Sequence, residues 1–524
     1  MKVVSLLTIL LFCDTVSSDI VDGKSLSDRL KKIKDEMGVT HMQEFYNNLT
    51  FIAKTDDGNT FLQKIIRQIS SSINNRKDVL TIIQNTVLNN EKKFNSQAIL
   101  SMCCNKNDTY VYDLKFRHWV DFSKACVTRS PYSQPNVILP PEEIGNKMKE
   151  NYKNYNILWQ HYDTKDGTAV IYPSTYWTGC TEYDPRLRSQ FAGTVSPRYK
   201  DLVIVLDSSK SMADNPSGIK DNSKFVIAKE AAYHVLDTLT PNDRVAAFSF
   251  DTDVHQLEGC YRNTMSFASK ENINHLQNKI KLIQSFNILG KDTGKALATA
   301  FSYLSLDTYN KSRDLVILLV TDGNNTKGEN ATNVIRLENM KLQNRVIIFT
   351  YLLGPDVSSD DKKLLQEMAT QTQSDNKYGE IKPGQYHYLD TTDHNTLAIK
   401  MATYYLHKPL RTTDRSTSAF TVPYVDLFSK TGLMISMCLP TYVTNGFDGV
   451  SCTDIKLSEL LKDTEYFSDD NASYAFMIDK TGRALIHPLL PDPTNATITD
   501  LVLVDIAALE RSPHSDEVIS LMKR

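Results

Sequence analysis

A short apolar run ends abruptly in polar side chains between Asp201 and Met212, where the sequence is DLVIVLDSSKSM. Asp207, Ser209 and Ser211 occupy alternate positions at this point and offer one carboxylate and two hydroxyl groups. Such hard oxygen ligands suit Mg²⁺ or Ca²⁺ better than zinc or copper. A strand end followed by a helix N-cap gives the same local pattern, so the spacing alone leaves both interpretations open.

Two further segments bring polar side chains to the same predicted edge. The apolar run Leu315–Val320 ends in Thr321-Asp322-Gly323, and Gly290–Gly294 precedes a predicted helix. Open α/β sheets bind their ligands at the carboxyl ends of the strands, where these three loops should meet. Together the loops predict a divalent-cation site.

The elements that must hold these loops alternate between strand and helix from Asp201 to about Lys408. This alternation predicts βαβ units and a doubly wound α/β domain. The predicted strands are Leu202–Leu206, Arg244–Phe250, Leu315–Val320, Arg345–Leu353 and Tyr386–Leu389. The predicted helices are Lys224–Leu239, Asn272–Ile283, Gly294–Leu304, Ala331–Gln343 and Asp360–Thr370.

The chain before this domain has two different characters. Residues 19–110 nearly lack Gly and Pro and are predicted to be helical, as in the amphipathic stretches Ser25–Met37 and Phe61–Ile73. Residues 111–198 are rich in aromatic side chains and short apolar runs such as Thr168–Tyr172, which predict strands and core.

The chain after this domain, residues 409–524, is predicted to be α+β with mostly short strands. Ser473–Asp479 alternates, Lys480-Thr481-Gly482 forms a turn, and Arg483–Pro488 returns, which predicts a hairpin. Ile455–Leu461 is predicted to be a helix between strands.

Composition narrows the class of protein. A chain of 524 residues with 41% hydrophobic and 23% charged residues is globular and too long for one core. Its net charge of -3, without a long basic run, argues against nucleic-acid binding. No segment beyond the N-terminus offers about 18 consecutive apolar residues, so no membrane span is predicted.

The N-terminus and the cysteines predict secretion. Lys2, the apolar segment Val3–Phe12 and small residues before Asp19 indicate a signal peptide over residues 1–18. Removing Cys13 with this segment leaves seven cysteines, most of which an oxidising compartment would pair. Because seven is an odd number, either one thiol stays free or its partner lies outside this chain. The predicted glycosylation sites are Asn48, Asn107, Asn310, Asn330, Asn471 and Asn495.

The motifs DSSKSM, GKDTGKAL and VTDG resemble the metal-ion-dependent adhesion site of von Willebrand factor type A domains. Leu158-Trp159-Gln160, Tyr183–Arg188 and SYAFMIDKTGRALIHP resemble the α2δ auxiliary subunits of voltage-gated calcium channels, and more closely the related von Willebrand A and cache domain-containing proteins. The resemblance implies a cache (PAS-like) domain interrupted by the A domain at residues 199–408 and preceded by a helical segment.

The resemblance also implies a set of site residues. Asp207, Ser209 and Ser211 would bind Mg²⁺ or Ca²⁺ directly, and Asp322 directly or through water. An acidic side chain from a partner would complete the shell, since a hard cation accepts a further carboxylate oxygen.

The sequence departs from the family pattern at two places. Lys291 occupies the position of a coordinating Thr, with Thr293 two residues later as a possible substitute ligand. An ammonium group aimed at the site would repel the cation or take its place. In the predicted ligand pocket Arg188 is kept, but Gln190 and Phe191 replace two aromatics of amino-acid-binding members, so tight amino-acid binding is not expected.

A further sequon, at Asn324, lies two residues after Asp322. A glycan at that position would crowd a docking partner. We therefore expect this sequon to be unused or the docking role to be weakened.

Three functions remain open at this point. The first is a non-catalytic extracellular protein that binds a membrane channel or receptor, such as the pore-forming subunit of a voltage-gated calcium channel. The second is a small-molecule sensor built on the cache domain, with Arg188 holding a carboxylate. The third is a soluble extracellular adhesion protein. An enzyme is disfavoured because H-E-x-x-H, G-x-S-x-G and P-loop motifs are absent from the sequence.

Overall fold

The computed structural model describes most of the chain between Asp22 and Met522. The described residues are 22–48, 58–91, 101–131, 133, 139–155, 157–180, 183–196, 198–215, 223–257, 259–284, 288–305, 313–323, 327–354, 357–389, 394–407, 418–425, 431–444, 446–462, 474, 476–479, 482–494, 504–512 and 514–522. The predicted signal peptide and the sequons at Asn310, Asn324, Asn471 and Asn495 lie outside them.

The chain falls into two units, residues 1–64 and residues 65–524. In the first unit, α2 (Gly23–Glu36) and α3 (Val39–Asn47) confirm the predicted helical character. Every side chain of α2 is exposed, including the apolar ones at Leu26, Leu30 and Ile33. Helix α4 (Gly58–Asn89) continues into the second unit.

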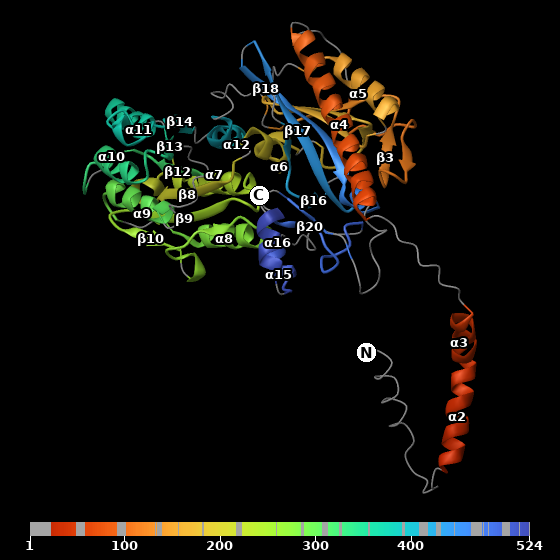
Figure 1. The fold of residues 1–524 in the computed structure, drawn as a ribbon. Coiled ribbons are helices and arrows are strands. Elements are labelled where there is room, and N and C mark those ends of the chain that lie inside the picture. Colours follow the sequence, from red (N-terminus) through yellow and green to blue (C-terminus); the bar gives the residue numbers. More distant parts are fainter. Residues whose placement is uncertain are drawn as a thin grey trace. The chain divides into compact units, whose positions relative to one another are not determined.

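Among the described residues of the second unit, strands between Lys200 and Leu389 form a seven-stranded sheet in the order β10-β9-β8-β12-β13-β14, with β11 paired to β9 (Figure 1). Neighbouring strands from β9 to β14 run parallel, and β10 and β11 run antiparallel to β9. The strands are β8 (Lys200–Asp207), β9 (Arg244–Phe250), β10 (Val254–Gln256), β11 (Ser266–Phe267), β12 (Asp314–Thr321), β13 (Val346–Leu353) and β14 (Tyr386–Leu389). All five predicted strands are confirmed, so the doubly wound α/β architecture is correct.

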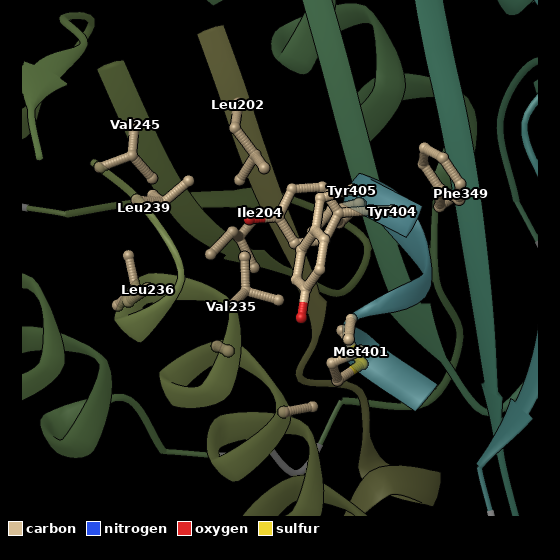
Figure 2. Close-up of a cluster of buried hydrophobic side chains, with 14 of the residues drawn as sticks. Leu202, Ile204, Val235, Leu236, Leu239, Val245, Phe349, Met401, Tyr404 and Tyr405 are labelled. Carbon is tan, nitrogen blue, oxygen red and sulfur yellow. The ribbon is translucent and has the colours of Figure 1, made fainter. Parts of the chain in front are cut away.

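Helices cover both faces of this sheet because apolar side chains point to both faces, with successive residues of each strand on opposite sides. Even positions of β8 such as Leu202 and Ile204 face one core, and Val203 and Val205 face the other. Figure 2 shows Leu202 and Ile204 beside Tyr404 and Tyr405 in the first of these cores. The helices over that face are α7 (Lys224–Asp237), α8 (Lys270–Leu282), α12 (His394–Met401) and α13 (Thr403–Leu406); those over the other are α9 (Thr293–Ser305), α10 (Ala331–Lys341) and α11 (Ser359–Thr370).

A second, eight-stranded sheet is built from segments on both sides of the first sheet in the sequence. Its order is β1-β4-β6-β5-β18-β17-β15, with β16 paired to β17. The strands are β1 (Ser101–Met102), β4 (Cys126–Arg129), β5 (Gln160–Thr164), β6 (Thr168–Tyr172), β15 (Ala419–Phe420), β16 (Tyr424–Val425), β17 (Leu433–Val443) and β18 (Gly446–Lys456). The two halves join where β5 pairs antiparallel with β18, for example Tyr162 with Ser451. The chain from β8 to β14 is therefore inserted between strands of this sheet.

Helices also pack on the eight-stranded sheet. Leu80 of α4 contacts Met437 and Leu439 of β17, and Gln84 of α4 donates a hydrogen bond to the Pro440 carbonyl at 2.9 Å (Figure 1). Helix α5 (Glu142–Tyr155) lies against β6. A smaller sheet is formed by β2 (Val111–Asp113), β3 (His118–Asp121) and β7 (Ser174–Thr175).

Several predictions for the flanking regions need correction. Strand β1 begins at Ser101, inside the region predicted to be helical. After residue 409 the long strands β17 and β18 dominate, and Ile455 and Lys456 belong to β18 while the helix α14 is Leu457–Lys462. The predicted hairpin is confirmed but shorter, as β19 (Met477–Ile478) and β20 (Ala484–Ile486).

The described residues of the second unit include three disulfide bonds. They join Cys103 to Cys126, Cys104 to Cys180, and Cys438 to Cys452. The last one links the paired strands β17 and β18. The seventh predicted mature cysteine, Cys260, has a side chain outside the described residues.

Within the described part of the chain, no helix combines the length and the apolar composition that crossing a bilayer requires.

Candidate functional site

The predicted polar cluster forms at the carboxyl edge of the seven-stranded sheet. Strands β8 and β12 are parallel neighbours with Leu206 opposite Val320, so Asp207 and Thr321 end them side by side. Asp207 is fully buried, and the Asp322 side chain is 4% exposed. Asp207 is the last residue of β8, whereas the sequence predicted a strand that ends at Leu206.

The serines of the first loop hydrogen-bond these two carboxylates. Ser209 donates its backbone N–H and its hydroxyl to Asp207 Oδ1, at 2.9 and 2.6 Å. The Ser211 hydroxyl donates to Asp322 Oδ1 at 3.0 Å and lies 3.2 Å from the Ser209 hydroxyl. The structure thus brings Asp207, Ser209, Ser211 and Asp322 together.

Lys291 lies between the two carboxylates. Its Nζ is 2.6 Å from Asp207 Oδ2 and 2.5 Å from Asp322 Oδ1, and its side chain is 6% exposed. Burial alone would lower the pKa of Lys291, but the two carboxylates outweigh this effect and raise it above the usual value. Lys291 is therefore a charged ammonium group inside the cluster.

Two residues of the cluster were not predicted as members. The Thr321 hydroxyl donates to Asp207 Oδ2 at 2.6 Å, and Lys224, the first residue of α7, donates to Asp322 Oδ2 at 2.9 Å. Burial would raise the pKa of Asp322, but Lys291 and Lys224 outweigh it and hold the pKa below its ordinary value. Thr321 directly precedes Asp322 and could have been found; Lys224 is 98 residues away and gave no local signal.

The loop before α9 explains why Lys291 points into the site. Asp292 Oδ1 accepts a hydrogen bond from the Lys295 N–H at 2.8 Å, so its side chain is used at the helix N-terminus. The Lys327 N–H donates to the Lys291 carbonyl at 3.1 Å. Gly328 has φ +79°, and a Cβ there would lie 2.1 Å from Asp292, so this loop and the next one pack closely. Thr293 is buried as the first residue of α9, and its role as a ligand stays a prediction.

As arranged, these residues do not fit a divalent cation. All four oxygens of Asp207 and Asp322 already accept hydrogen bonds from side chains or backbone of the chain. In the described residues, no group of three or more His, Cys, Asp or Glu side chains could hold a metal ion. The predicted Mg²⁺ or Ca²⁺ would have to displace Lys291.

The second predicted site surrounds Arg188, which lies between a 3-10 turn (Pro185–Leu187) and α6 (Ser189–Val195). Arg188 donates a hydrogen bond to the Tyr183 hydroxyl at 2.8 Å. A hollow of about 690 Å³ opens here, and its lining includes Arg188, Tyr183, Trp119 and Trp177. Gln190 and Phe191 are buried in the interior instead of lining this hollow.

A buried charged group in the sheet lies near Arg188. His161 Nδ1 is 2.9 Å from Asp163 Oδ2, and its Nε2 is 3.7 Å from Asp454 Oδ1. Burial alone would lower the pKa of His161, but the carboxylates outweigh it and raise the pKa to about 10. Burial would raise the pKa of Asp454, but His161, with a smaller contribution from Arg188, outweighs it and lowers the pKa.

Comparison with known proteins identifies the inserted domain. The family model of the von Willebrand factor type A domain matches residues 201–389. The chain contains a von Willebrand factor type A domain. The inserted sheet, its flanking helices and the polar cluster all lie within or next to this match.

Curated relatives extend the similarity beyond the A domain. The chain is 25% identical over 376 residues to the human voltage-dependent calcium channel subunit alpha-2/delta-4, covering 67% of this chain and 30% of that protein. It is 25% identical over 369 residues to the alpha-2/delta-3 subunit of Rattus norvegicus, covering 67% and 31%. The predicted resemblance to the α2δ subunits is confirmed at this level, and the match spans about a third of the relatives' length. The cache assignment of the eight-stranded sheet stays a prediction.

Among solved structures, a von Willebrand factor type A protein from Catenulispora acidiphila is similar at 15% identity, with a TM-score of 0.32 over 49% of this chain and 57% of that one.

Replacing Lys291 with Met should destabilise the protein by about 3 to 5 kcal/mol, because it leaves two buried carboxylates beside an apolar group. Chemical unfolding followed by fluorescence measures the change. Lys295→Met is the matched control, since Lys295 pairs with Asp253 at 2.6 Å on the surface and its loss should leave the unfolding midpoint unchanged. Equal midpoints for Lys291→Met and the wild type would contradict the buried ion cluster.

The stability of the protein should fall as the pH rises from 6.5 towards 10. The folded-state pKa of His161 is raised from 6.5 to about 10, so its stabilising charge is fully present below pH 6.5 and is lost through the upper value. Thermal midpoints measured across this range should decline less steeply for His161→Gln. The control is His275→Gln, because His275 on α8 is exposed, and its thermal midpoint should change with pH as in the wild type. An unchanged pH dependence in His161→Gln would contradict the raised pKa of His161.

Proposed function

We propose that this protein is a non-catalytic extracellular interaction protein of the α2δ type. On this proposal the carboxyl edge of the A-domain sheet docks a membrane partner, and the docking modulates the activity or trafficking of that partner. The observation that carries the proposal is the charge-balanced cluster of Asp207, Asp322, Lys291 and Lys224 at this edge. The relatives' names support the pore-forming subunit of a voltage-gated calcium channel as the partner.

The cysteines and sequons support the extracellular location. Three disulfide bonds among the described residues are typical of an oxidising compartment. Asn48, Asn107 and Asn330 are exposed, as glycosylation requires. Attachment to the cell surface would come through the partner or through an anchor.

The chemistry of the cluster supports a non-catalytic role. A nucleophilic serine needs a neighbouring base whose pKa lies near the working pH. The hydroxyls of Ser209 and Ser211 instead donate to carboxylates, and the pKa of Asp322 lies below its usual value. Both carboxylates hold the loops in place, and the lowered pKa makes Asp322 too weakly basic to activate a hydroxyl.

The rim of the edge is where a partner would make contact. Lys210 is exposed between the buried Ser209 and the half-buried Ser211, so its ammonium group faces outwards beside the cluster. A partner that presents a carboxylate here would gain from this charge, mainly through a faster association rate.

Reversing the charge of Lys210 with Lys210→Glu should weaken partner binding by about three- to tenfold. We would measure binding of the purified protein to the pore-forming subunit of a voltage-gated calcium channel in membranes, together with current density on co-expression. Lys341→Glu is the control, because Lys341 ends α10 at the opposite edge of the sheet and is 63% exposed. Absence of binding by the wild type would reject this partner, and equal loss in both variants would reject this edge.

A second candidate function is supported by the hollow around Arg188. Its aromatic lining and single guanidinium group could hold a small molecule with a carboxylate, such as an amino acid. This function would make the protein a sensor, with the A domain as scaffold.

If the sensor hypothesis holds, millimolar leucine should raise the thermal midpoint of the wild type. Arg188→Gln should abolish the rise, whereas Tyr183→Phe, which removes only the hydroxyl that Arg188 contacts, should retain it. A wild-type midpoint unaffected by leucine and the other small amino acids would argue against the sensor.

A further inference from the structure

We propose that Lys291 is the built-in cation of the A-domain edge and takes the place of a metal ion. The docking contact would then require no divalent cation. The assignment of Lys291 rests on the geometry of the cluster, and the statement about docking rests on the proposed function.

The position of the ammonium group is the first argument. Lys291 Nζ bridges Asp207 Oδ2 and Asp322 Oδ1 at 2.6 and 2.5 Å, so it forms charge-assisted hydrogen bonds with both carboxylates. It also lies 3.4 Å from the Thr321 hydroxyl. These are the two carboxylates that were predicted to hold Mg²⁺ or Ca²⁺, so a metal between them and Lys291 would compete for the same oxygens.

The hydrogen bonds of the ligand oxygens are the second argument. Asp207 Oδ1 accepts from Ser209, and Oδ2 accepts from Thr321 and Lys291. Asp322 Oδ1 accepts from Ser211 and Lys291, and its Oδ2 accepts from Lys224. An entering cation would have to break several of these bonds and also turn the serine hydroxyls away from the carboxylates.

The charge balance is the third argument. Two carboxylates face two ammonium groups, Lys291 and Lys224, so the four groups sum to zero. A divalent cation added to them would leave two uncompensated positive charges in a buried site, which is strongly unfavourable. If Lys291 were absent, the cation would instead be attracted by both carboxylates.

The backbone holds Lys291 at the site. The loop from Gly290 to Asp292 is fixed by the hydrogen bond from the Lys327 N–H to the Lys291 carbonyl, and by another from the Asp292 N–H to the Asp251 carbonyl at 2.8 Å. If the Lys291 ammonium group left the site, Asp207 and Asp322 would remain buried without the cation that lies between them. The cation of this edge is therefore covalently part of the chain and always present.

The first test measures Mn²⁺ binding to the whole protein by electron paramagnetic resonance of the free ion, with thermal midpoints in EDTA and in Mn²⁺. The wild type should bind no Mn²⁺ at this site and show no midpoint shift. Lys291→Thr should bind Mn²⁺, and its midpoint should rise by about 5 °C or more at about a hundred times the dissociation constant. The double variant Lys291→Thr with Asp322→Asn should lose this gain.

Two results would overturn the proposal. One is Mn²⁺ binding by the wild type that Asp207→Asn abolishes, and the other is a folded Lys291→Thr protein that binds no Mn²⁺. If Lys291→Thr fails to fold, Lys291→Ser replaces it. If neither variant folds, the titrations of the wild type and of Asp207→Asn decide. Equal Mn²⁺ binding by the two proteins supports the proposal, and weaker binding by Asp207→Asn rejects it.

The second test separates this inference from the proposed function. Partner binding by the wild type should be the same in EDTA and in millimolar Mg²⁺ or Ca²⁺. Loss of binding in EDTA would overturn the built-in cation while keeping the docking function. Absence of binding under every condition would reject the docking function and leave the Mn²⁺ result to judge Lys291.

Discussion

Two carboxylates buried at the ends of adjacent parallel strands must have positive charge beside them. This constraint arises from the pairing of β8 with β12, because the pairing places the ends of the two strands, and so the two carboxylates, next to each other. Lys291 supplies this charge from the loop before α9, and Lys224 supplies it from the first residue of α7. The three loops of this edge are therefore held together by one set of ion pairs, and the A-domain sheet below them fixes where each loop begins.

The fold of the A domain could be predicted because its apolar runs and helical periods are strong local patterns. Arg244–Phe250 and Tyr386–Leu389 were predicted with their observed limits. The long strands β17 and β18 were missed since Pro440 and Gly449 interrupt the apolar pattern that normally marks a strand. These two strands form because they pair with each other and because β18 pairs with β5. Such long-range pairing cannot be inferred from the periodicity of the sequence.

The site was predictable to the extent that its members follow strands. Asp207, Ser209, Ser211 and Asp322 were found from position alone, and the structure places them together. Lys291 was noted as an unusual residue, but its distance from the carboxylates depends on how the loop before α9 is fixed by Asp292 and Gly328. Lys224 could not be found, since only the packing of α7 on the sheet brings it to Asp322.

The interrupted eight-stranded sheet has a consequence for how the chain is made. Strand β5 pairs with β18, and Gly449 lies opposite Thr164, so the sheet needs segments that are synthesised far apart in time. Until β18 emerges from the ribosome, β5 keeps an unpaired edge, which is a site for wrong pairing with other chains. The inserted domain contains mostly sequential βαβ units, so its local contacts favour its formation before the eight-stranded sheet is complete. The A domain thus has a place in the folding order of this chain that is separate from any partner that it binds.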